Sequence, residues 1–378
     1  MKKIPFNTPY ITGKEIGYIV EAIGALSLSG DGLFTKRCQS FFEQKYGFGK
    51  CLLTTSCTDA LEMAAILFDI QPGDEVIMPS FTFVSTANAF VLRGAKIVFA
   101  DSEENSPNID PTKIEALITP KTKAIVVVHY GGVACEMDEI MDVAKRHSLF
   151  VVEDAAQAID AYYKGRPLGS IGHLAAFSFH STKNIISGEG GMLVINDSRF
   201  LERSEIIRDK GTNRGRFSRG EVDKYEWTDV GSSFLPSDII AAFLYAQLEQ
   251  IKEIQTNRKT AWIQYWDGLK PLSDAGFFQC FSIASHKQHN ANLFYIVTQN
   301  EEERSGLVSA LHENGIASAF HYLSLHKSPF YATHHDGRNL PNADTFSGRL
   351  LRLPFFSAIK PEQIERVIAQ IKLFYSTS

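Results

Sequence analysis

Between residues 50 and 200, short runs of consecutive apolar residues alternate with segments whose apolar residues recur every three or four positions. The apolar runs are DEVIMPS, AKIVFAD, KAIVVVHY, LFVVEDAA, LAAFSFH and GMLVIN. Such runs are typical of strands buried on both faces, as in a parallel sheet that is covered by helices. The spacing in SCTDALEMAAILFDI and EMDEIMDVAKRHS predicts helices of that kind. The pattern therefore predicts an α/β fold with a mostly parallel sheet.

The pattern changes in the last third of the chain. A long helical pattern covers residues 236–269 and could connect two domains. The strand-like NANLFYIVTQ follows it, and then the helical ERSGLVSALHENG and EQIERVIAQIKLFY. This order predicts a smaller α+β domain at the C-terminus. We therefore divide the chain into a large domain at residues 1–245 and a small domain at residues 246–378.

Composition narrows the function classes. Of the 378 residues, 44% are hydrophobic and 21% are charged, which is ordinary for a globular protein. The net charge of −5 leaves no basic stripe for nucleic acid. We expect neither a signal peptide nor a membrane span, because MKKIPFNTPY lacks an apolar core and no run of about 18 apolar residues follows. Five scattered cysteines without C-x-x-C indicate reduced thiols in a cytoplasmic protein, with no disulfide frame and no metal site.

Polar residues follow the apolar runs at the positions where a ligand is expected. In parallel sheets of this kind, ligands bind at the carboxyl ends of the strands. The corresponding positions are Ser80–Phe83, Asp101, His129–Tyr130, Asp154–Gln157 and Ser178–Lys183. We expect the chemistry of the protein at these positions.

Hydroxyl residues also surround the start of the first predicted helix. Ser56 and Thr58, with Cys57 between them, precede a strongly apolar segment. They could simply cap the helix. The free N–H groups, the helix dipole and the hydroxyls could equally seat a phosphate. The local sequence leaves both interpretations open.

Four further residues each have an ordinary explanation when taken singly. Asp154 could cap a helix, pair with an arginine or face a cationic ligand nitrogen. Lys183 could be a solvated loop charge or a nucleophile. Ser178 could be a satisfied hydroxyl, and Phe83 a core residue. Together they provide what pyridoxal phosphate (PLP) requires: an amine for its aldehyde, an anion site, a carboxylate for its ring nitrogen and an apolar cover. We therefore predict a PLP site with Lys183 as the nucleophile.

Several long segments are similar to those of one family. They are GDEVIMPSFTFVSTANAFVLRGAKIVFAD, VVEDAAQA, SFHSTKNIISGEGG, IIRDKGTNR, RGEVDKYEWTDVGSSFLPSDIIAAFLYAQL and FHYLSLH. With them the sequence resembles, over nearly its whole length, the DegT/DnrJ/EryC1/StrS sugar aminotransferases, a branch of the fold-type I PLP enzymes. The resemblance implies a mostly parallel sheet of the seven-stranded type flanked by helices, with a smaller α+β C-terminal domain.

The resemblance also implies roles around the cofactor ring. Lys183 is implied to bind the cofactor through its ε-amine and to act as the acid and base. Asp154 is implied to bind the pyridinium nitrogen, Phe83 to stack on the ring and Gln157 to lie near the ring hydroxyl. Dehydratase relatives carry a His in place of the lysine. Because Lys183 is present and His180 lies three positions earlier, transamination is favoured.

A second set of implied roles concerns the cofactor phosphate. Ser178, Thr58 and the backbone N–H of Cys57 are implied to hold it. Related enzymes add an Asn from a neighbouring subunit. The matching position in this sequence is Leu235, with Ser233 nearby as our candidate. The resemblance therefore implies a homodimer with its active sites at the interface.

The segments SFHSTKNIISGEGG, RDKGTNR and RGEVDKYEW look most like those of family members that make dTDP-4-amino-4,6-dideoxygalactose. This implies L-glutamate and dTDP-4-dehydro-6-deoxyglucose as substrates, and a role in lipopolysaccharide O-antigen or enterobacterial common antigen synthesis in the cytoplasm. The 4-amino gluco epimer and a 3-amino dTDP-sugar stay open as products. A non-catalytic sensor with this fold is disfavoured because Lys183, Asp154 and Phe83 are all present.

The residues that orient the sugar nucleotide are expected in three segments, namely Ser29–Phe34, Arg214–Tyr225 and His321–His326. The sequence GDG in the first segment permits a close approach of the backbone to a ligand. A solvated surface explains the second segment equally well, and core or surface histidines explain the third. The candidates are Asp31, Phe34, Arg219, Lys224, Tyr225, His321 and His326.

Overall fold

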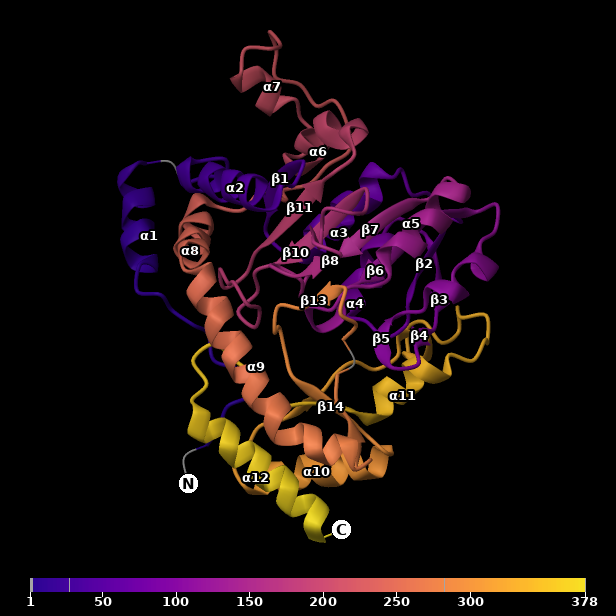
Figure 1. Cartoon of the computed structure of the whole chain (residues 1–378). Helices are drawn as coiled ribbons and strands as arrows, with labels where there is room; N and C mark the ends of the chain where they lie inside the picture. Colours follow the sequence, from indigo (N-terminus) through magenta and orange to yellow (C-terminus); the bar gives the residue numbers. More distant parts are fainter. Residues whose placement is uncertain (1–2, 27, 282, 378) are drawn as a thin grey trace.

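The structure is a computed structural model that describes residues 3–26, 28–281 and 283–377. A large sheet with its helices forms the upper part of the molecule in Figure 1, and a smaller sheet with long helices forms the lower part. The helices of the first part are α1 (Glu15–Gly24), α2 (Leu33–Tyr46), α3 (Cys57–Leu67), α4 (Val84–Val91), α5 (Met137–Arg146), α6 (Leu201–Arg208), α7 (Arg214–Ser218) and α8 (Asp238–Glu249).

The large sheet has seven strands in the order β1-β11-β10-β7-β6-β2-β3. Only β11 runs antiparallel to its neighbours in this sheet, and the other adjacent pairs are parallel. The strands are β1 (Lys50–Thr54), β2 (Glu75–Pro79), β3 (Lys96–Ala100), β6 (Thr122–Val128), β7 (Phe150–Asp154), β10 (Leu174–Ser178) and β11 (Gly191–Ile195). The predicted mostly parallel sheet is confirmed.

Both faces of this sheet are buried, because successive strand residues point to opposite sides. In β6, Ile125 and Val127 belong to one apolar cluster together with Val151 of β7. Val126, between them, belongs to another cluster together with Val152. Each buried Val or Ile side chain contributes roughly 1.5–3 kcal/mol, so both helix layers are held firmly.

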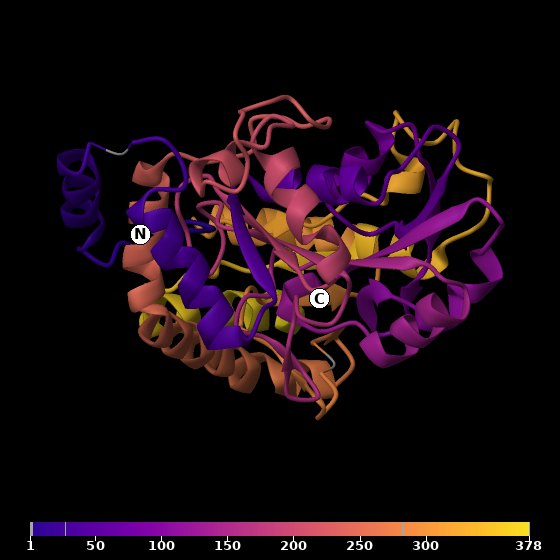
Figure 2. The same ribbon diagram turned by 90° about the horizontal axis from the view of Figure 1, so that it is seen from above.

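Different helices cover the two faces. On one face, α3 contributes Leu61 and Met63 and α4 contributes Phe90. On the other face, α2, α5 and α8 contribute residues such as Phe42 and Ile140. In Figure 2, which views the molecule from above, α1 lies at the rim of the molecule outside α8.

The smaller part is built on a four-stranded antiparallel sheet in the order β12-β14-β16-β15. Its strands are β12 (Phe278–Gln279), β14 (Tyr295–Thr298), β15 (Ala319–Phe320) and β16 (Leu350–Arg352). Its helices are α9 (Ile251–Asp274), α10 (Glu301–Glu313), α11 (Pro341–Arg349) and α12 (Pro361–Thr377). The remaining strands form two small ladders: β4 (Ser102–Glu103) with β5 (Ser106–Ile109), and β13 (Lys287–Gln288) with β8 (Tyr162–Tyr163) and β9 (Arg166–Pro167).

The long helical pattern at residues 236–269 is two helices, α8 and α9, that meet at Gln250. The backbone of Gln250 leaves helical geometry at φ −104° and ψ 9°. Here the chain turns from the large sheet toward the small one (Figure 1). Our domain boundary at residues 245–246 lies inside α8 and stays a prediction.

Asp101 joins the two parts of the molecule. Its carboxylate accepts hydrogen bonds from the backbone N–H groups of Asn342 (3.2 Å) and Ala343 (2.8 Å). These groups lie in the first turn of α11, where N–H groups lack partners within the helix and favour a negative charge. Asp101 therefore caps a helix, which corrects our expectation that it takes part in the chemistry. No helix in the described part of the chain is long and apolar enough to span a membrane.

Candidate active site

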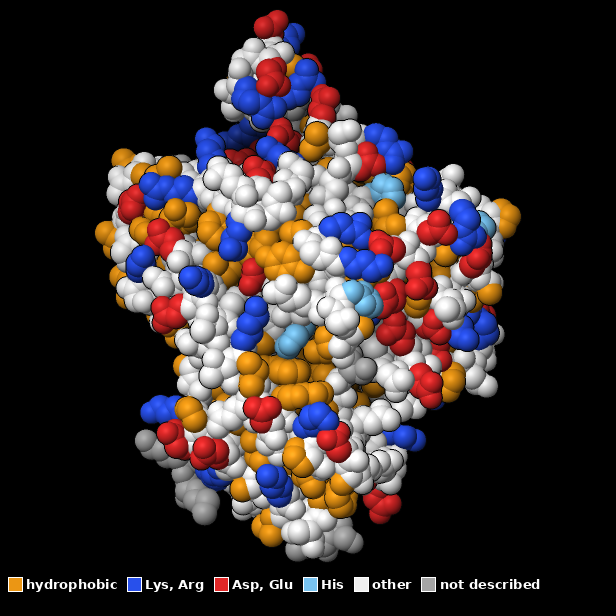
Figure 3. All heavy atoms as spheres, in the orientation of Figure 1, with side chains coloured by type: hydrophobic (Ala, Val, Ile, Leu, Met, Phe, Trp, Pro, Cys, Tyr) orange, Lys and Arg blue, Asp and Glu red, His pale blue; other side chains and the backbone are white. Residues whose placement is uncertain are grey.

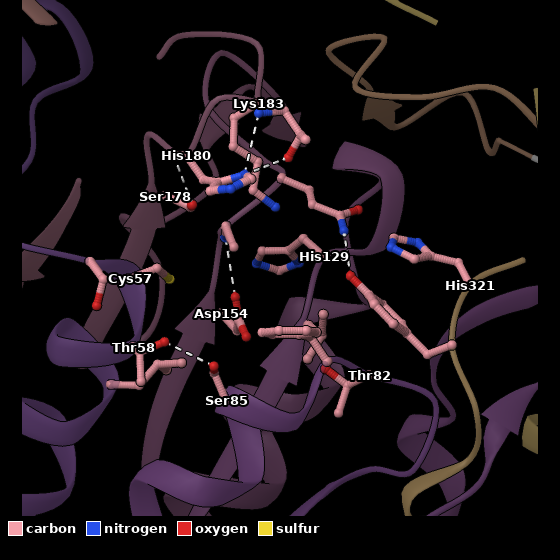
Figure 4. Close-up of a pocket in the computed structure, with 18 of the residues that line it drawn as sticks. Cys57, Thr58, Thr82, Ser85, His129, Asp154, Ser178, His180, Lys183 and His321 are labelled. Atoms are coloured by element: carbon pink, nitrogen blue, oxygen red, sulfur yellow. Dashed lines mark hydrogen bonds between the residues drawn. The ribbon is translucent and has the colours of Figure 1, made fainter. Parts of the chain in front are cut away.

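A cavity of about 500 Å³ lies at the carboxyl ends of β7 and β10. The first turns of α3 and α4 and the loop after β15 complete its walls (Figure 4). The predicted residues that line it are Cys57, Thr58, Phe83, Asp154, Gln157, Ser178, Lys183 and His321. Residues far apart in the sequence therefore meet in one cavity.

Lys183 lies on the loop that joins β10 to β11. The loop is folded tightly: the N–H of Lys183 donates to the carbonyl of His180 (2.9 Å), and the N–H of Ser181 donates to that of Gly188 (2.9 Å). The half-buried side chain points into the cavity (Figure 4). Burial lowers the pKa of its amine, although Cys57 and Asp154 oppose this shift. A larger share of neutral, nucleophilic amine is therefore present than for an ordinary lysine.

This shift predicts a pH profile for Lys183 in the cofactor-free protein. We expect carbamylation by cyanate, followed by peptide mass spectrometry, to reach half its maximal rate below pH 10.5, the ordinary value. The reason is that only the neutral amine reacts and burial disfavours the charged form. The same peptide in denatured protein is the control, and equal midpoints in the two samples would contradict the prediction.

Asp154 ends β7 with its carboxylate fixed and buried. The hydroxyl of Thr86 donates to Oδ2 (2.7 Å), and the N–H of Ala156 donates to Oδ1 (3.1 Å). Burial raises the pKa of this carboxyl, and the lowering effects of these hydrogen bonds and of Lys183 do not cancel it. A cationic group on a ligand would stabilise the ionised form.

His129 and Glu153 form a buried pair at the cavity; the sequence pointed to His129 but not to Glu153. The fully buried side chains join through His129 Nε2 and Glu153 Oε2 (2.9 Å), while the N–H of Cys135 donates to His129 Nδ1 (3.2 Å). Since Nδ1 accepts a hydrogen bond, Nε2 is the ring nitrogen that donates to Glu153. The backbone N–H groups of Gly169 and Gly172 also donate to Glu153. The signal in the sequence that could have revealed Glu153 is the pair of adjacent acids in the buried run VVEDAA.

At one end of the cavity, two helix N-termini converge. The hydroxyl of Ser56 caps α3 by accepting from the N–H of Asp59 (3.0 Å), while Cys57 and Thr58 begin the helix and line the cavity. The Thr58 hydroxyl donates to that of Ser85 in the first turn of α4 (2.8 Å). Ser56 is thus a helix cap, and the positive helix ends with their hydroxyls can also receive an anion.

Gly191 allows these elements to approach closely. It pairs with Thr54 of β1 and with Ser178 of β10 at the edge of the cavity. A Cβ atom at this position would lie 2.2 Å from the carbonyl carbon of Ser56 and 2.4 Å from the backbone nitrogen of Cys57. A side chain here would therefore displace the start of α3.

Replacing Gly191 by alanine is expected to lower the free energy of unfolding by about 1–3 kcal/mol, because the added Cβ overlaps with backbone atoms. Urea unfolding of the cofactor-free protein measures this loss. The control is Gly17→Ala in α1, where a Cβ meets nothing within 4 Å. Alanine is the better helix former there, by roughly 0.5–1 kcal/mol. Equal stability of Gly191→Ala and the unaltered protein would contradict the expected overlap.

Aromatic rings form the opposite side of the cavity. Phe83 is 54% exposed, and its ring centroid lies 6.0 Å from that of Tyr322. Gln157 is held at both ends of its amide, since Oε1 accepts from the N–H of Gly131 (2.7 Å) and Nε2 donates to the Tyr322 hydroxyl (3.2 Å). His321 stacks on Tyr322 at 3.6 Å, and burial lowers the pKa of its imidazole, which is therefore neutral. Tyr322 lies in the segment His321–His326 that the sequence indicated, but it was not among the individual candidates.

Two predicted substrate residues lie in the core. Phe34 is 0% exposed and packs against the rings of Tyr18 and Tyr245. His326 is 5% exposed, and its Nδ1 is hydrogen-bonded to the Ser80 hydroxyl (2.7 Å). Neither side chain lines the cavity. We therefore correct both expectations, because packing rather than ligand contact accounts for these residues.

Asp31 and Ser233 also lie outside this cavity. Both carboxylate oxygens of Asp31 accept from Nη2 of Arg208 (2.7 Å each), so this charge is already paired. Ser233 is exposed and forms a backbone bridge with Asp209. A substrate role for Asp31 and a phosphate role for Ser233 stay predictions.

The remaining predicted substrate residues lie on the projection around α7, at the top of Figure 1. Arg219 pairs there with Glu205 (3.0 Å) and Glu221 (2.6 Å). Tyr225 is 52% exposed and Lys224 is exposed as well. None of the three predicted residues lines the cavity of its own chain. Their roles stay predictions.

Comparison with known proteins places this geometry in a family. The model of the DegT/DnrJ/EryC1/StrS aminotransferase family matches residues 9–372. The chain belongs to this family. The aminotransferase reaction for which the family is named agrees with an amine and a carboxylate that face one cavity beside an anion seat.

The family assignment is supported by individual relatives. The spore coat polysaccharide biosynthesis protein SpsC of Bacillus subtilis is 34% identical over 380 residues, which cover 98% of this chain and 96% of SpsC. The structure of DesV from S. venezuelae is 30% identical with a TM-score of 0.90 and covers 99% of both chains. Spr1654 from Streptococcus pneumoniae in its PLP form is 25% identical with a TM-score of 0.90, and covers 100% of this chain and 99% of its own.

The protein is therefore a PLP-dependent sugar aminotransferase with the fold-type I architecture. The residues of the cavity fit the cofactor. Gly191 keeps the anion seat at α3 free of a side chain, Asp154 offers a fixed carboxylate, and Lys183 offers an amine of lowered pKa. When bound, PLP supplies an electron sink for the negative charge that develops next to the transferred nitrogen.

Proposed function

We propose that this aminotransferase moves the amino group of L-glutamate to C4 of dTDP-4-dehydro-6-deoxy-D-glucose and forms dTDP-4-amino-4,6-dideoxy-D-galactose for a surface polysaccharide. The convergence of Lys183, Asp154 and the α3 N-terminus in one cavity carries the proposal. The segments SFHSTKNIISGEGG and RGEVDKYEW support this particular sugar. The relative SpsC, whose name refers to spore coat polysaccharide synthesis, supports a surface polysaccharide as the destination.

The chain's own residues perform the proton transfers in this proposal. Nζ of Lys183, whose lowered pKa increases the share of neutral amine, takes the proton from Cα of the amino donor. The same nitrogen later returns a proton to C4 of the sugar. Asp154 holds a proton on the ring nitrogen of the cofactor, and its own position is fixed by Thr86. Ser178, Thr58 and the N–H of Cys57 would bind the phosphate, Phe83 would cover the ring, and Gln157 would lie near the ring hydroxyl.

We further propose a homodimer that works in the cytoplasm. The α1 residues Ile16, Val20 and Ile23 share one helix face and are 77%, 62% and 47% exposed. Apolar side chains gather over this part of the surface in Figure 3. Trp227, on the projection around α7, is 82% exposed. A second copy of the chain would cover these residues, and the projection of one subunit would then lie near the cavity of the other. A monomer in analytical ultracentrifugation at micromolar concentration would contradict this assembly.

The experiment is to incubate the PLP-loaded protein with L-glutamate and dTDP-4-dehydro-6-deoxy-D-glucose and to assign the product by NMR. Coupling constants at C4 separate the galacto from the gluco epimer, and the position of the amine separates a 4-amino from a 3-amino sugar. If NMR shows the gluco epimer or a 3-amino sugar, the proposed product is wrong and the observed sugar takes its place. If no amino sugar forms and the visible absorption of the cofactor does not change with L-glutamate, a non-catalytic sensor is indicated.

A further inference from the structure

One wall of the main cavity is built by two segments that follow strands of different sheets. Thr82 and Phe83 follow β2 of the large sheet. His321 and Tyr322 follow β15 of the small sheet. In Figure 4, Thr82 and His321 lie on the same side of the cavity. The shape of this wall therefore depends on how the two segments are held against each other.

Two buried polar residues, Ser80 and His326, join these segments. The hydroxyl oxygen of Ser80 lies 2.7 Å from Nδ1 of His326, and the same oxygen accepts from the backbone N–H of His326 (3.2 Å). The carbonyl of Ser80 accepts from the backbone N–H of Leu325 (3.0 Å). Three hydrogen bonds to one residue after β2 therefore hold the loop after β15.

The direction of the side-chain hydrogen bond follows from the surroundings of the imidazole. Burial lowers the pKa of His326, so the neutral ring prevails at neutral pH. Its Nε2 faces the carboxylate of Asp344 in α11 (3.5 Å), and a carboxylate only accepts hydrogen bonds. This arrangement favours a proton on Nε2, so that Nδ1 accepts from the Ser80 hydroxyl. Both ring nitrogens then face a suitable partner, as burial requires.

Each member of the Ser80–His326 pair lies a few residues from an aromatic ring of the wall. Phe83 follows Ser80 after β2, and Tyr322 precedes His326 after β15. The ring centroids of Phe83 and Tyr322 lie 6.0 Å apart. A shift of one segment against the other would change this separation, whereas Lys183 is held by the hydrogen bonds of its own loop. The pair therefore acts on the aromatic wall and not on the amine.

We propose that Ser80 and His326 are positioning residues, whose hydrogen bond sets the separation of Phe83 and Tyr322 that transamination requires. Neither Ser80 nor His326 lines the cavity, so both act through the rings that do. The proposal rests on the aminotransferase function of the main cavity and not on the identity of the sugar. It gives one role to two polar residues that the sequence indicated and that lie outside the cavity.

The test removes the hydrogen bond from either side in the PLP-loaded protein. Ser80→Ala and His326→Leu are expected to lower the rate at which L-glutamate changes the cofactor absorption by about 10- to 100-fold, because small misplacements in a catalytic site have effects of this size. His326→Asn is expected to recover most of the rate, since its Oδ1 can accept from the Ser80 hydroxyl in place of Nδ1. Borohydride labelling of Lys183 is expected to stay complete in all of these variants.

A matched control separates positioning from a general loss of stability. Ser102→Ala also removes a buried hydroxyl, which donates to the carbonyl of Pro107 (3.0 Å) within the large part of the molecule. We expect a loss of stability in urea comparable to that of Ser80→Ala, but the rate of the unaltered protein. The double variant Ser80→Ala/His326→Leu should lose no more rate than either single variant, because both changes remove the same interaction.

Three results would overturn the proposal. They are an equal loss of rate in Ser102→Ala and Ser80→Ala, additive losses in the double variant, and loss of the borohydride label from Lys183. A failure of the proposed function is distinguishable from these results. If the unaltered protein reacts with L-glutamate but not with the keto-sugar, the proposed sugar is wrong, whereas the expected order of rates among the variants in the first half-reaction still supports the positioning role.

Discussion

Replacing Lys183 by alanine is expected to lower transamination by about 10⁴-fold or more, because one side chain provides both the nucleophile and the acid and base. The amine points into the cavity, and no second lysine lines that cavity in the described part of the chain. Turnover with L-glutamate and the keto-sugar measures the loss. Borohydride reduction of the PLP-loaded protein, followed by peptide mapping, identifies the labelled lysine independently.

The control for this variant is Lys360→Ala, an exposed lysine in front of α12. It is expected to keep full turnover and the borohydride label on the peptide that contains residue 183. The Lys183→Ala protein should still fold, because its side chain makes no ion pair in the described residues. A borohydride label on any other lysine would overturn the assignment of the nucleophile.

Replacing Asp154 by asparagine is expected to lower kcat/KM by about 30- to 1,000-fold, the range for removing one partner of a buried charge pair. Asparagine keeps an oxygen that can accept from Thr86 but has no charge to hold a proton on the cofactor nitrogen. The control is Thr86→Val, which removes a hydrogen bond but leaves the carboxylate, and for which we expect a smaller loss. Equal losses in the two variants would show that the position of the side chain matters rather than its charge.

The cofactor-free protein gives a second readout for Asp154. Its pKa in the folded state is raised above the ordinary 3.8. Between 3.8 and the raised value, the folded state binds more protons than the unfolded state, so stability falls as pH rises through this window. Asp154→Asn should remove this fall and leave the cofactor-free protein more stable above the window. Urea unfolding at several pH values measures the difference, and parallel curves for both proteins would contradict it.

The sequence predicted the layers of the fold and much of the cavity for one physical reason. A strand buried on both faces is apolar at nearly every position, as in KAIVVVHY, and the short length of such runs favours strands over buried helices. Parallel strands that end together also bring their following residues together, which is why Asp154, Ser178 and Lys183 were found. The hydroxyls at the start of α3 were recognisable because capping depends on adjacent residues.

Residues whose roles depend on contacts with distant segments were assigned wrongly or missed. Asp101 ends a strand as Asp154 does, but its neighbour in space is the first turn of α11, so it caps that helix. Phe34 follows a flexible-looking GDG and is nevertheless buried against rings from α1 and α8. Such outcomes depend on which element packs against the residue, and that element is distant in the sequence.

By itself, the sequence determined the sheet, the helix layers and the residues that the large domain contributes to the cavity, because these follow from burial along one segment at a time. Only the tertiary structure decided what faces them. His321 and Tyr322, which follow β15 of the small sheet, line the cavity with Lys183 only because the fold places the small sheet next to the large one. Contacts between distant segments cannot be recognised in a sequence, because they depend on which elements the fold brings together.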